Sequence, residues 1–209
     1  AAYLHLLAES MKLAFADRSQ YLGDPDFAPV PVAELTDKAY AARLRKLIDP
    51  VRAMPAAEIA PGRALRAEST ETTHYSIADR QGNVVSNTYT LNASFGSSIA
   101  VPGTGMLLNN EMGDFAALPG KPNLFGLMQG ERNRIEGGKR PLSSMSPTIV
   151  FRDGKPWLAT GSPGGSRIIT TVLQTLLNAM AFDMNVAAAG MNSRIHHQWL
   201  PDEILAEDG

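Results

Sequence analysis

The chain has 209 residues, 44% hydrophobic and 19% charged, a composition typical of a folded domain rather than a disordered tail or a coiled coil. Its 19 basic and 21 acidic residues give a net charge of −2, so no excess of positive charge is present to hold a nucleic-acid backbone. The absence of cysteine excludes disulfides, a thiolate nucleophile and thiolate-ligated metal sites. No apolar run approaches the roughly 18 residues of a membrane span. We therefore expect no nucleic-acid partner and no membrane span in this chain.

The first 49 residues predict a helix, a loop and a second helix. The first helix has an apolar face at helical spacing, formed by Leu4, Leu7, Met11 and Phe15. Glycine and prolines between residues 23 and 31 break the pattern. Thr36 is the expected cap of the second helix, whose apolar face is Tyr40, Leu44, Leu47 and Ile48. Residues 50–71 have no periodicity and several prolines, which predicts an exposed, mobile connection.

Residues 72–209 have a different character. Two β-prone runs, 73–78 and 84–91, flank turn residues and predict a hairpin, and 148–151 with 157–160 predict a second one around Asp153-Gly154. A helix apolar nearly all round follows from Ile168 to Met180, and we expect it to be buried. Hairpins and helices with few parallel crossovers indicate an α+β fold.

Two loops could bind an anion. The glycine pair in Gly161-Ser162-Pro163-Gly164-Gly165-Ser166 lies just before a helix, where backbone N–H groups could hold a phosphate or a developing oxyanion. The alternative is a strand-to-helix turn capped by Ser166. The cluster from Lys139 to Pro147 combines cations with three serines and suits a carboxylate ligand, although a capped surface loop fits its composition as well.

Metal signals are weak. His196 and His197 are neighbours, which point to opposite faces if they lie on a strand. Asp24 and Asp26 flank a proline, and turn formation explains them better than calcium binding. We expect no metal site and no cofactor.

Thr72 stands at the sharpest boundary in the chain, where the polar segment ends and the first β-prone run begins. A threonine hydroxyl is a poor nucleophile unless an adjacent base takes its proton, and a free α-amine on the same residue, with a pKa near roughly 8, can do this. That chemistry requires a cut directly before Thr72. The alternative is that a threonine pair simply starts a strand.

Several blocks together resemble the γ-glutamyltranspeptidase (glutathione hydrolase) family. In chain order they are Thr-Thr-His-Tyr-Ser at 72–76, Thr-Tyr-Thr-Leu-Asn at 88–92, Leu-Asn-Asn-Glu-Met-Gly-Asp-Phe at 108–115, Arg-Pro-Leu-Ser-Ser-Met-Ser-Pro at 140–147 and Gly-Ser-Pro-Gly-Gly-Ser-Arg at 161–167. Upstream, residues 16–26 resemble the end of the family's large subunit. The similarity covers nearly the whole chain.

The resemblance implies an N-terminal-nucleophile hydrolase with an αββα sandwich, made as a precursor (zymogen) that cuts itself autocatalytically into two subunits. By similarity, residues 1–71 are the end of the large subunit and residues 72–209 are the small, catalytic subunit, with the cut between Glu71 and Thr72. The implied activity is that of a hydrolase and acyltransferase of glutathione metabolism. Thr72 attacks the γ-amide of glutathione or another γ-glutamyl compound, and water, an amino acid or a peptide resolves the γ-glutamyl ester.

The resemblance also assigns the site residue by residue. Thr90 matches the threonine that supports the nucleophile, and Gly164 and Gly165 match the oxyanion-hole amides. Residues that match the ammonium-binding set are Asn92, Glu111 and Asp114. Ser143 and Ser144 match the hydroxyls near the substrate α-carboxylate. The arginine that clamps this carboxylate in the family lies upstream of Ala1.

The resemblance further implies that the chain is an internal piece of the precursor, truncated at both ends. We therefore expect only part of the sandwich, the remainder of the large subunit as partner, and little activity from the piece alone. Bacterial relatives are mostly periplasmic or secreted, which is the expected location. Three alternatives stay open: a cephalosporin or glutaryl acylase, a poly-γ-glutamate-processing relative, and a non-catalytic scaffold. The ammonium-binding set argues against an acylase, whose substrate lacks that group.

Overall fold

The computed structural model describes residues 1–59 and 72–208. The chain forms two compact units by its internal contacts. Within the described residues, unit 1 comprises 1–59, 112–143 and 195–206, and unit 2 comprises 72–111, 144–194 and 207–208. The units do not follow the predicted subunit boundary at 71/72. That boundary concerns where the chain is cut, and it stays a prediction.

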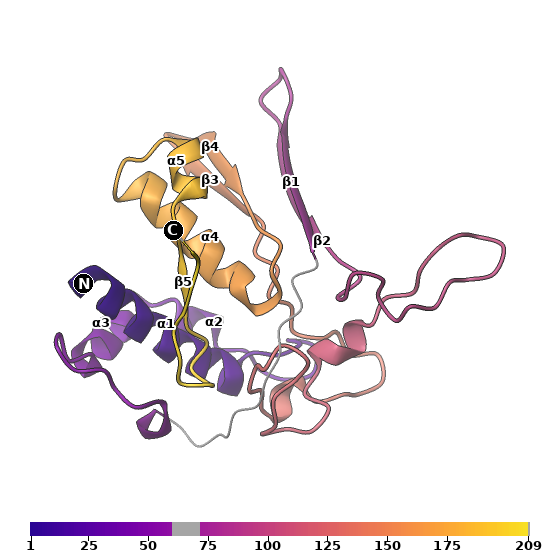
Figure 1. Cartoon of the computed structure of the whole chain (residues 1–209), viewed down its shortest axis with the longest axis horizontal. Helices are drawn as coiled ribbons and strands as arrows, with labels where there is room; N and C mark the ends of the chain where they lie inside the picture. Colours follow the sequence, from indigo (N-terminus) through magenta and orange to yellow (C-terminus); the bar gives the residue numbers. More distant parts are fainter. Residues whose placement is uncertain (60–71, 209) are drawn as a thin grey trace. The chain divides into compact units, whose positions relative to one another are not determined.

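Unit 1 is built around one long helix. The helices are α1 (Ala2–Tyr21), α2 (Val32–Leu35) and α3 (Lys38–Leu47), with short 3-10 turns η1 (Ala56–Glu58) and η3 (Glu131–Asn133). The two-residue strands β5 (Ile195–His196) and β6 (Leu205–Ala206) pair antiparallel, and β5 lies alongside α1 (Figure 1). The buried apolar residues of this unit include Leu7, Met11 and Phe15 of α1 and, from distant segments, Phe115, Leu127 and Trp199.

The predicted helices of this region are present, with corrections at their ends and faces. Leu4 is 47% exposed, so the buried face of α1 starts at Leu7. Asp37, not Thr36, caps α3: its carboxylate accepts hydrogen bonds from the backbone N–H groups of Ala39 and Tyr40 at 2.6 and 3.0 Å. A carboxylate reaches the first free N–H groups of a helix and also favours its positive end. No residue of α3 is fully buried: Tyr40 and Leu44 of the predicted apolar face are half-buried, and only Ile48, which follows the helix, is buried.

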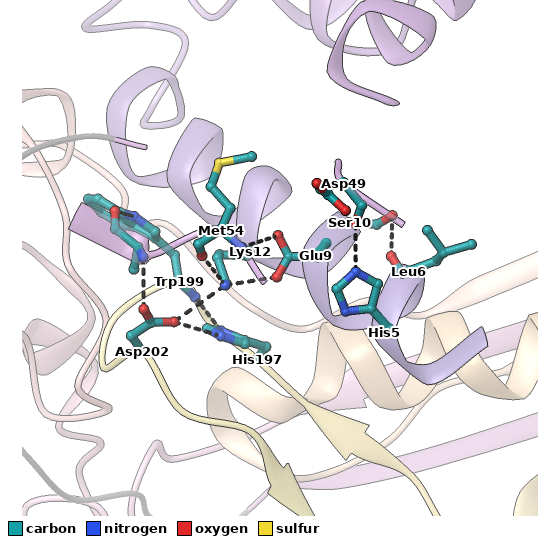
Figure 2. A network of polar contacts seen from close by, with 11 residues as sticks. His5, Leu6, Glu9, Ser10, Lys12, Asp49, Met54, His197, Trp199 and Asp202 are labelled. Carbon is teal, nitrogen blue, oxygen red and sulfur yellow. Dashed lines mark hydrogen bonds and ion pairs between the residues drawn. The ribbon is translucent and has the colours of Figure 1, made fainter. Parts of the chain in front are cut away.

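Three buried side chains and the more exposed Asp202 hold the segment that follows α3 (Figure 2). Lys12 Nζ donates to the Met54 carbonyl at 2.6 Å, and Glu9 accepts from the Met54 N–H at 3.1 Å. Asp202 accepts from the Ala56 N–H at 2.8 Å, while Trp199 Nε1 donates to the Ala56 carbonyl at 3.1 Å. The prediction of an exposed connection is therefore wrong at Met54 and Ala56. Residues 60–71 of that predicted connection lie outside the described residues.

Unit 2 consists of two hairpins and two helices. Strands β1 (Thr73–Ala78) and β2 (Val84–Tyr89) pair antiparallel, as do β3 (Thr148–Arg152) and β4 (Lys155–Thr160). Helix α4 (Ile168–Met180) packs against α5 (Val186–Met191). The two hairpins lie side by side, with Ser86 Oγ donating to the Thr160 carbonyl at 3.0 Å. Both predicted hairpins and the predicted helix are confirmed, and with them the α+β class.

Helix α4 is not buried all round as predicted. Leu173 and Met180 are 38% and 56% exposed, whereas the polar residues Thr170, Gln174, Thr175 and Asn178 are buried. Several of these polar groups bond to carbonyls of their own helix: Gln174 Nε2 donates to Thr170 at 2.8 Å, and Thr175 Oγ1 to Thr171 at 3.0 Å. Local bonding of this kind removes most of the cost of burying a polar side chain. Hydrophobic periodicity alone cannot anticipate it.

Candidate active site

Thr72 lies at the open end of the first hairpin. It directly precedes β1 and is half-buried. Because Thr73 pairs with Tyr89, the register places Thr72 next to Thr90 on the opposite arm. Thr90 Oγ1 accepts a hydrogen bond from the Asn92 N–H at 2.8 Å. Three of the predicted site residues thus meet at one end of a hairpin.

Asn92 links this end of the hairpin to the segment that carries Glu111. It is buried and adopts a left-handed backbone with φ of 78°. Its Nδ2 donates to the Asn110 carbonyl at 3.0 Å, and Asn110 returns a backbone N–H to the Leu91 carbonyl at 3.1 Å. Glu111 follows directly and opens the 3-10 turn η2 (Glu111–Asp114). The turn puts the two predicted acidic residues within one short element.

The glycine loop after β4 begins against the first hairpin. A Cβ on Gly161 would lie 2.2 Å from His74 Nδ1, so only glycine fits here. His74 Nδ1 also hydrogen-bonds Thr88 Oγ1 at 2.7 Å, and burial lowers the pKa of this histidine, which favours its neutral form. The loop therefore starts beside a residue only two positions from Thr72.

The glycine pair itself has a backbone that other residues rarely adopt. Gly164 and Gly165 have φ of 127° and 54°, both in the range that glycine tolerates without strain. They lead through η4 (Gly165–Arg167) into α4, and neither η4 nor α4 has a side-chain cap at its start. The N-cap positions of η4 and α4 are Gly164 and Arg167, and the fully buried Ser166 lies inside η4. That the glycine pair forms an oxyanion hole stays a prediction.

Asp114 and Ser143 belong to unit 1, where both neighbour a buried arginine of α1. Arg18 Nη2 donates to the Ser143 carbonyl at 3.5 Å. Burial lowers the pKa of Arg18 to about 10, while the attraction of the Asp114 carboxylate acts in the opposite direction. Ser144, the next residue along the chain, is half-buried and belongs to unit 2; its carbonyl accepts from Ser146 Oγ at 3.1 Å.

The segment leading to Ser143 is fixed at its start by a buried carboxylate. Asp24 accepts from the Arg140 backbone N–H and from Nε at 2.8 and 3.0 Å, and its other oxygen accepts from Nη2 at 2.6 Å. Asp24 also accepts from the Asp26 N–H at 3.1 Å, which is the predicted turn. Bidentate pairing of this kind fixes the guanidinium in one orientation.

Replacing Asp24 by asparagine should flatten the acid dependence of stability. Hydrogen bonds from Arg140 hold the pKa of Asp24 well below its usual value near 4, so the folded state loses this stabilisation only as pH falls below about 4. We expect the difference in urea midpoint between pH 6 and pH 3 to be smaller in Asp24→Asn than in wild type. Asp26→Asn is the matched control, because Asp26 bonds the same arginine from an exposed position. Equal acid dependence in Asp24→Asn and wild type would contradict the assignment.

The whole chain matches a known protein family. The model of the family described as "Gamma-glutamyltranspeptidase" matches residues 1–209. The chain belongs to this family. It is 56% identical over 206 residues to the glutathione hydrolase proenzyme of Escherichia coli, covering 99% of this chain and 36% of that protein. The chain thus spans about a third of the length of this curated relative of the γ-glutamyltranspeptidase family.

Two further relatives bear on fold and activity. The crystal structure of the T380A mutant of Helicobacter pylori γ-glutamyltranspeptidase is 60% identical and matches with a TM-score of 0.64, over 65% of this chain and 73% of that one. This likeness confirms the fold class expected from the sequence resemblance. The acylase ACY 1 proenzyme of Pseudomonas sp. strain SE83 is more distant, at 41% identity over 186 residues, covering 89% of this chain and 31% of that protein.

Two residues beside the predicted site of this γ-glutamyltranspeptidase family member, Arg18 and Asn133, were not singled out from the sequence. Arg18 lies in one of the matched blocks, yet its burial beside Asp114 and Ser143 had no sequence signal apart from its place on α1. Asn133 lies outside every matched block and bonds two of the predicted segments. The bond from Glu71 to Thr72, where the cut is predicted, begins outside the described residues. In the part of the chain that the structure describes, no helix is long and apolar enough to cross a membrane.

Proposed function

We propose that the full-length protein is a γ-glutamyl amidohydrolase and transferase in which Thr72 is the nucleophile. The observation that carries this proposal is the meeting of Thr72, Thr90 and Asn92 at the end of the first hairpin, beside the start of the glycine loop. Glutathione and other γ-glutamyl compounds are the proposed substrates. The name of the Escherichia coli relative supports the same chemistry.

Thr72 becomes reactive once its own amine is free. The amine takes the hydroxyl proton as Oγ1 attacks the γ-carbonyl carbon, and the electrons of the C=O bond move onto oxygen. The N–H groups of Gly164 and Gly165 are suited to hold this oxyanion. When the C–N bond breaks, the proton passes to the leaving amine, which from glutathione gives cysteinylglycine. A water molecule or an amino acid then displaces Thr72 from the ester.

Recognition of the glutamyl head group needs partners for its positively charged ammonium and for its negatively charged α-carboxylate. The amide of Asn92 and the carboxylates of Glu111 and Asp114 suit an ammonium, because opposite charges offset the cost of removing it from water. Hydroxyls of Ser143 and Ser144 suit the α-carboxylate. An acyl group that lacks the ammonium would leave the two carboxylates without their partner, so we expect it to be a poor substrate.

The nucleophilic amine has to be made by cutting the chain between Glu71 and Thr72. We infer that the protein is a precursor whose two products stay together as a heterodimer. The name of the Escherichia coli relative, a proenzyme, supports this order of events. In described unit 1 the chain is anchored at Met54 and Ala56, so a cut far downstream of these residues leaves that anchorage intact.

The test uses the full-length protein incubated at neutral pH. Mass spectrometry is expected to find a fragment that begins with Thr72, and γ-glutamyl p-nitroanilide should be cleaved on the order of 10³-fold faster than glutaryl p-nitroanilide, which lacks only the α-amino group. Preference for the glutaryl compound would support an acylase instead. An uncut chain without turnover would support a non-catalytic scaffold and contradict the proposal.

A further inference from the structure

A buried asparagine bonds two of the segments that carry the predicted head-group residues. Asn133 ends the 3-10 turn η3 and is 1% exposed. Its Nδ2 donates to the Asp114 carbonyl at 2.8 Å, and its Oδ1 accepts from the Leu142 N–H at 3.0 Å. Leu142 directly precedes Ser143. One planar amide therefore spans the backbone of the acidic residue and the backbone next to the serine.

The orientation of this amide is itself fixed. Asn133 Nδ2 also donates to Oε1 of Gln129, which is 2% exposed, and the Asn133 carbonyl accepts from the Ala116 N–H at 2.8 Å. The Leu142 N–H can only donate and the Asp114 carbonyl can only accept, so Asn133 must turn its oxygen toward Leu142 and its Nδ2 toward Asp114, and Gln129 then offers its oxygen to the same Nδ2. The donor side and the acceptor side of Asn133 thus face two different segments without an alternative arrangement.

No other side-chain type of similar size does both jobs. Aspartate could accept from Leu142 but has no hydrogen to give to the Asp114 carbonyl, and leucine or alanine could do neither. When one partner of a buried hydrogen bond is removed, the other group is left unsatisfied, which is costly inside a protein. The backbone segment that carries this group is then expected to move until the group is hydrogen-bonded again. Removing the amide therefore loosens the separation between the Asp114 and Ser143 segments rather than either segment alone.

We propose that Asn133 is a positioning residue that sets the spacing between Asp114 and Ser143, and so between the ammonium and carboxylate contacts of the substrate head group. It acts through these two residues and touches no substrate. This inference rests on the proposed function and deepens it, because it names the element that makes the site selective for an α-amino acid. Arg18 reaches the same two segments from α1, where its electrostatic attraction to Asp114 supports the arrangement.

The experiment compares Asn133→Ala with Asn178→Ala in the full-length protein. Asn178 is a matched control: it is 4% exposed, its side chain donates to the Ala189 carbonyl at 3.3 Å, and it belongs to α4, outside every matched block. In Asn133→Ala we expect KM for γ-glutamyl p-nitroanilide to rise about tenfold or more while kcat changes less. We also expect the preference for γ-glutamyl over glutaryl p-nitroanilide to fall, with the cut before Thr72 unchanged.

If the wild type is active and Asn133→Ala keeps the wild-type KM and the wild-type preference for the γ-glutamyl compound, this inference alone is overturned. Equal effects in Asn178→Ala would overturn it too, because they would show a general loss of stability. A wild type without turnover would overturn the proposed function and this inference with it. Should Asn133→Ala fail to fold, Gln129→Met removes only the second acceptor of Asn133 Nδ2, which helps to hold the amide in place, and a smaller rise in KM is expected; no rise would overturn the inference.

Discussion

Replacing Thr72 by alanine is expected to leave the full-length precursor uncut and to lower turnover of γ-glutamyl p-nitroanilide by a factor of at least about 10³. The hydroxyl of this one residue has two tasks in the proposed mechanism, since it attacks first the peptide bond before it and then the substrate. Alanine keeps the backbone of the strand start but supplies no oxygen. Mass spectrometry of the incubated protein and a continuous assay of nitroaniline release measure the two effects separately.

Two variants control this experiment. Thr73→Ala changes the exposed neighbouring threonine, the first residue of β1, and should leave both cutting and turnover within about twofold of wild type. Thr72→Ser keeps a hydroxyl and should still be cut. Efficient cutting of Thr72→Ala, or equal loss in Thr73→Ala, would show that the nucleophile lies elsewhere.

The hairpins illustrate what the sequence can predict. Runs of β-prone residues around Asp79–Asn83 and Asp153-Gly154 predict both hairpins, and the first pairs in one regular antiparallel register, whereas the second shifts register between Val150 and Phe151. From the register of the first hairpin the neighbourhood of Thr72 and Thr90 follows directly. The site residues that depend on local pairing were thus within reach of sequence reasoning.

The polar contacts between distant segments could not be predicted from the sequence. Asp24 meets Arg140 across 116 positions of chain, and Asn133 bonds Asp114 and Leu142 from a segment without periodicity. A buried polar side chain looks in the sequence like any surface residue, and only the fold decides which partner satisfies it. The predicted cap at Thr36 failed for a related reason, since two adjacent residues can both cap a helix and geometry selects one.

The buried charges of α1 give the largest expected effect on stability. Glu9 and Lys12 each have side chains only 3% exposed, and their ion pair measures 2.9 Å (Figure 2). Lys12 also lies 3.4 Å from Asp202 Oδ1.

His197 lies beside the same carboxylate, with its Nε2 at 3.3 Å from Asp202. Its Nδ1 accepts a hydrogen bond from the Trp199 N–H at 3.1 Å, so a neutral His197 carries its proton on Nε2. Burial, together with the charge of Lys12, lowers the pKa of His197 and favours that neutral form.

Replacing Lys12 by methionine should lower the free energy of unfolding by about 3 kcal/mol, because the Glu9 carboxylate stays buried without its cation. The urea midpoint at pH 7 measures this loss in the full-length protein. Lys46→Met, at an exposed position of α3, makes the same chemical change and should cost less than about 0.5 kcal/mol. The double variant Glu9→Gln with Lys12→Met should recover most of the loss, since no uncompensated charge then remains inside. If Lys12→Met proved no less stable than Lys46→Met, the pair would contribute nothing to holding the segment at Met54 and Ala56 on α1.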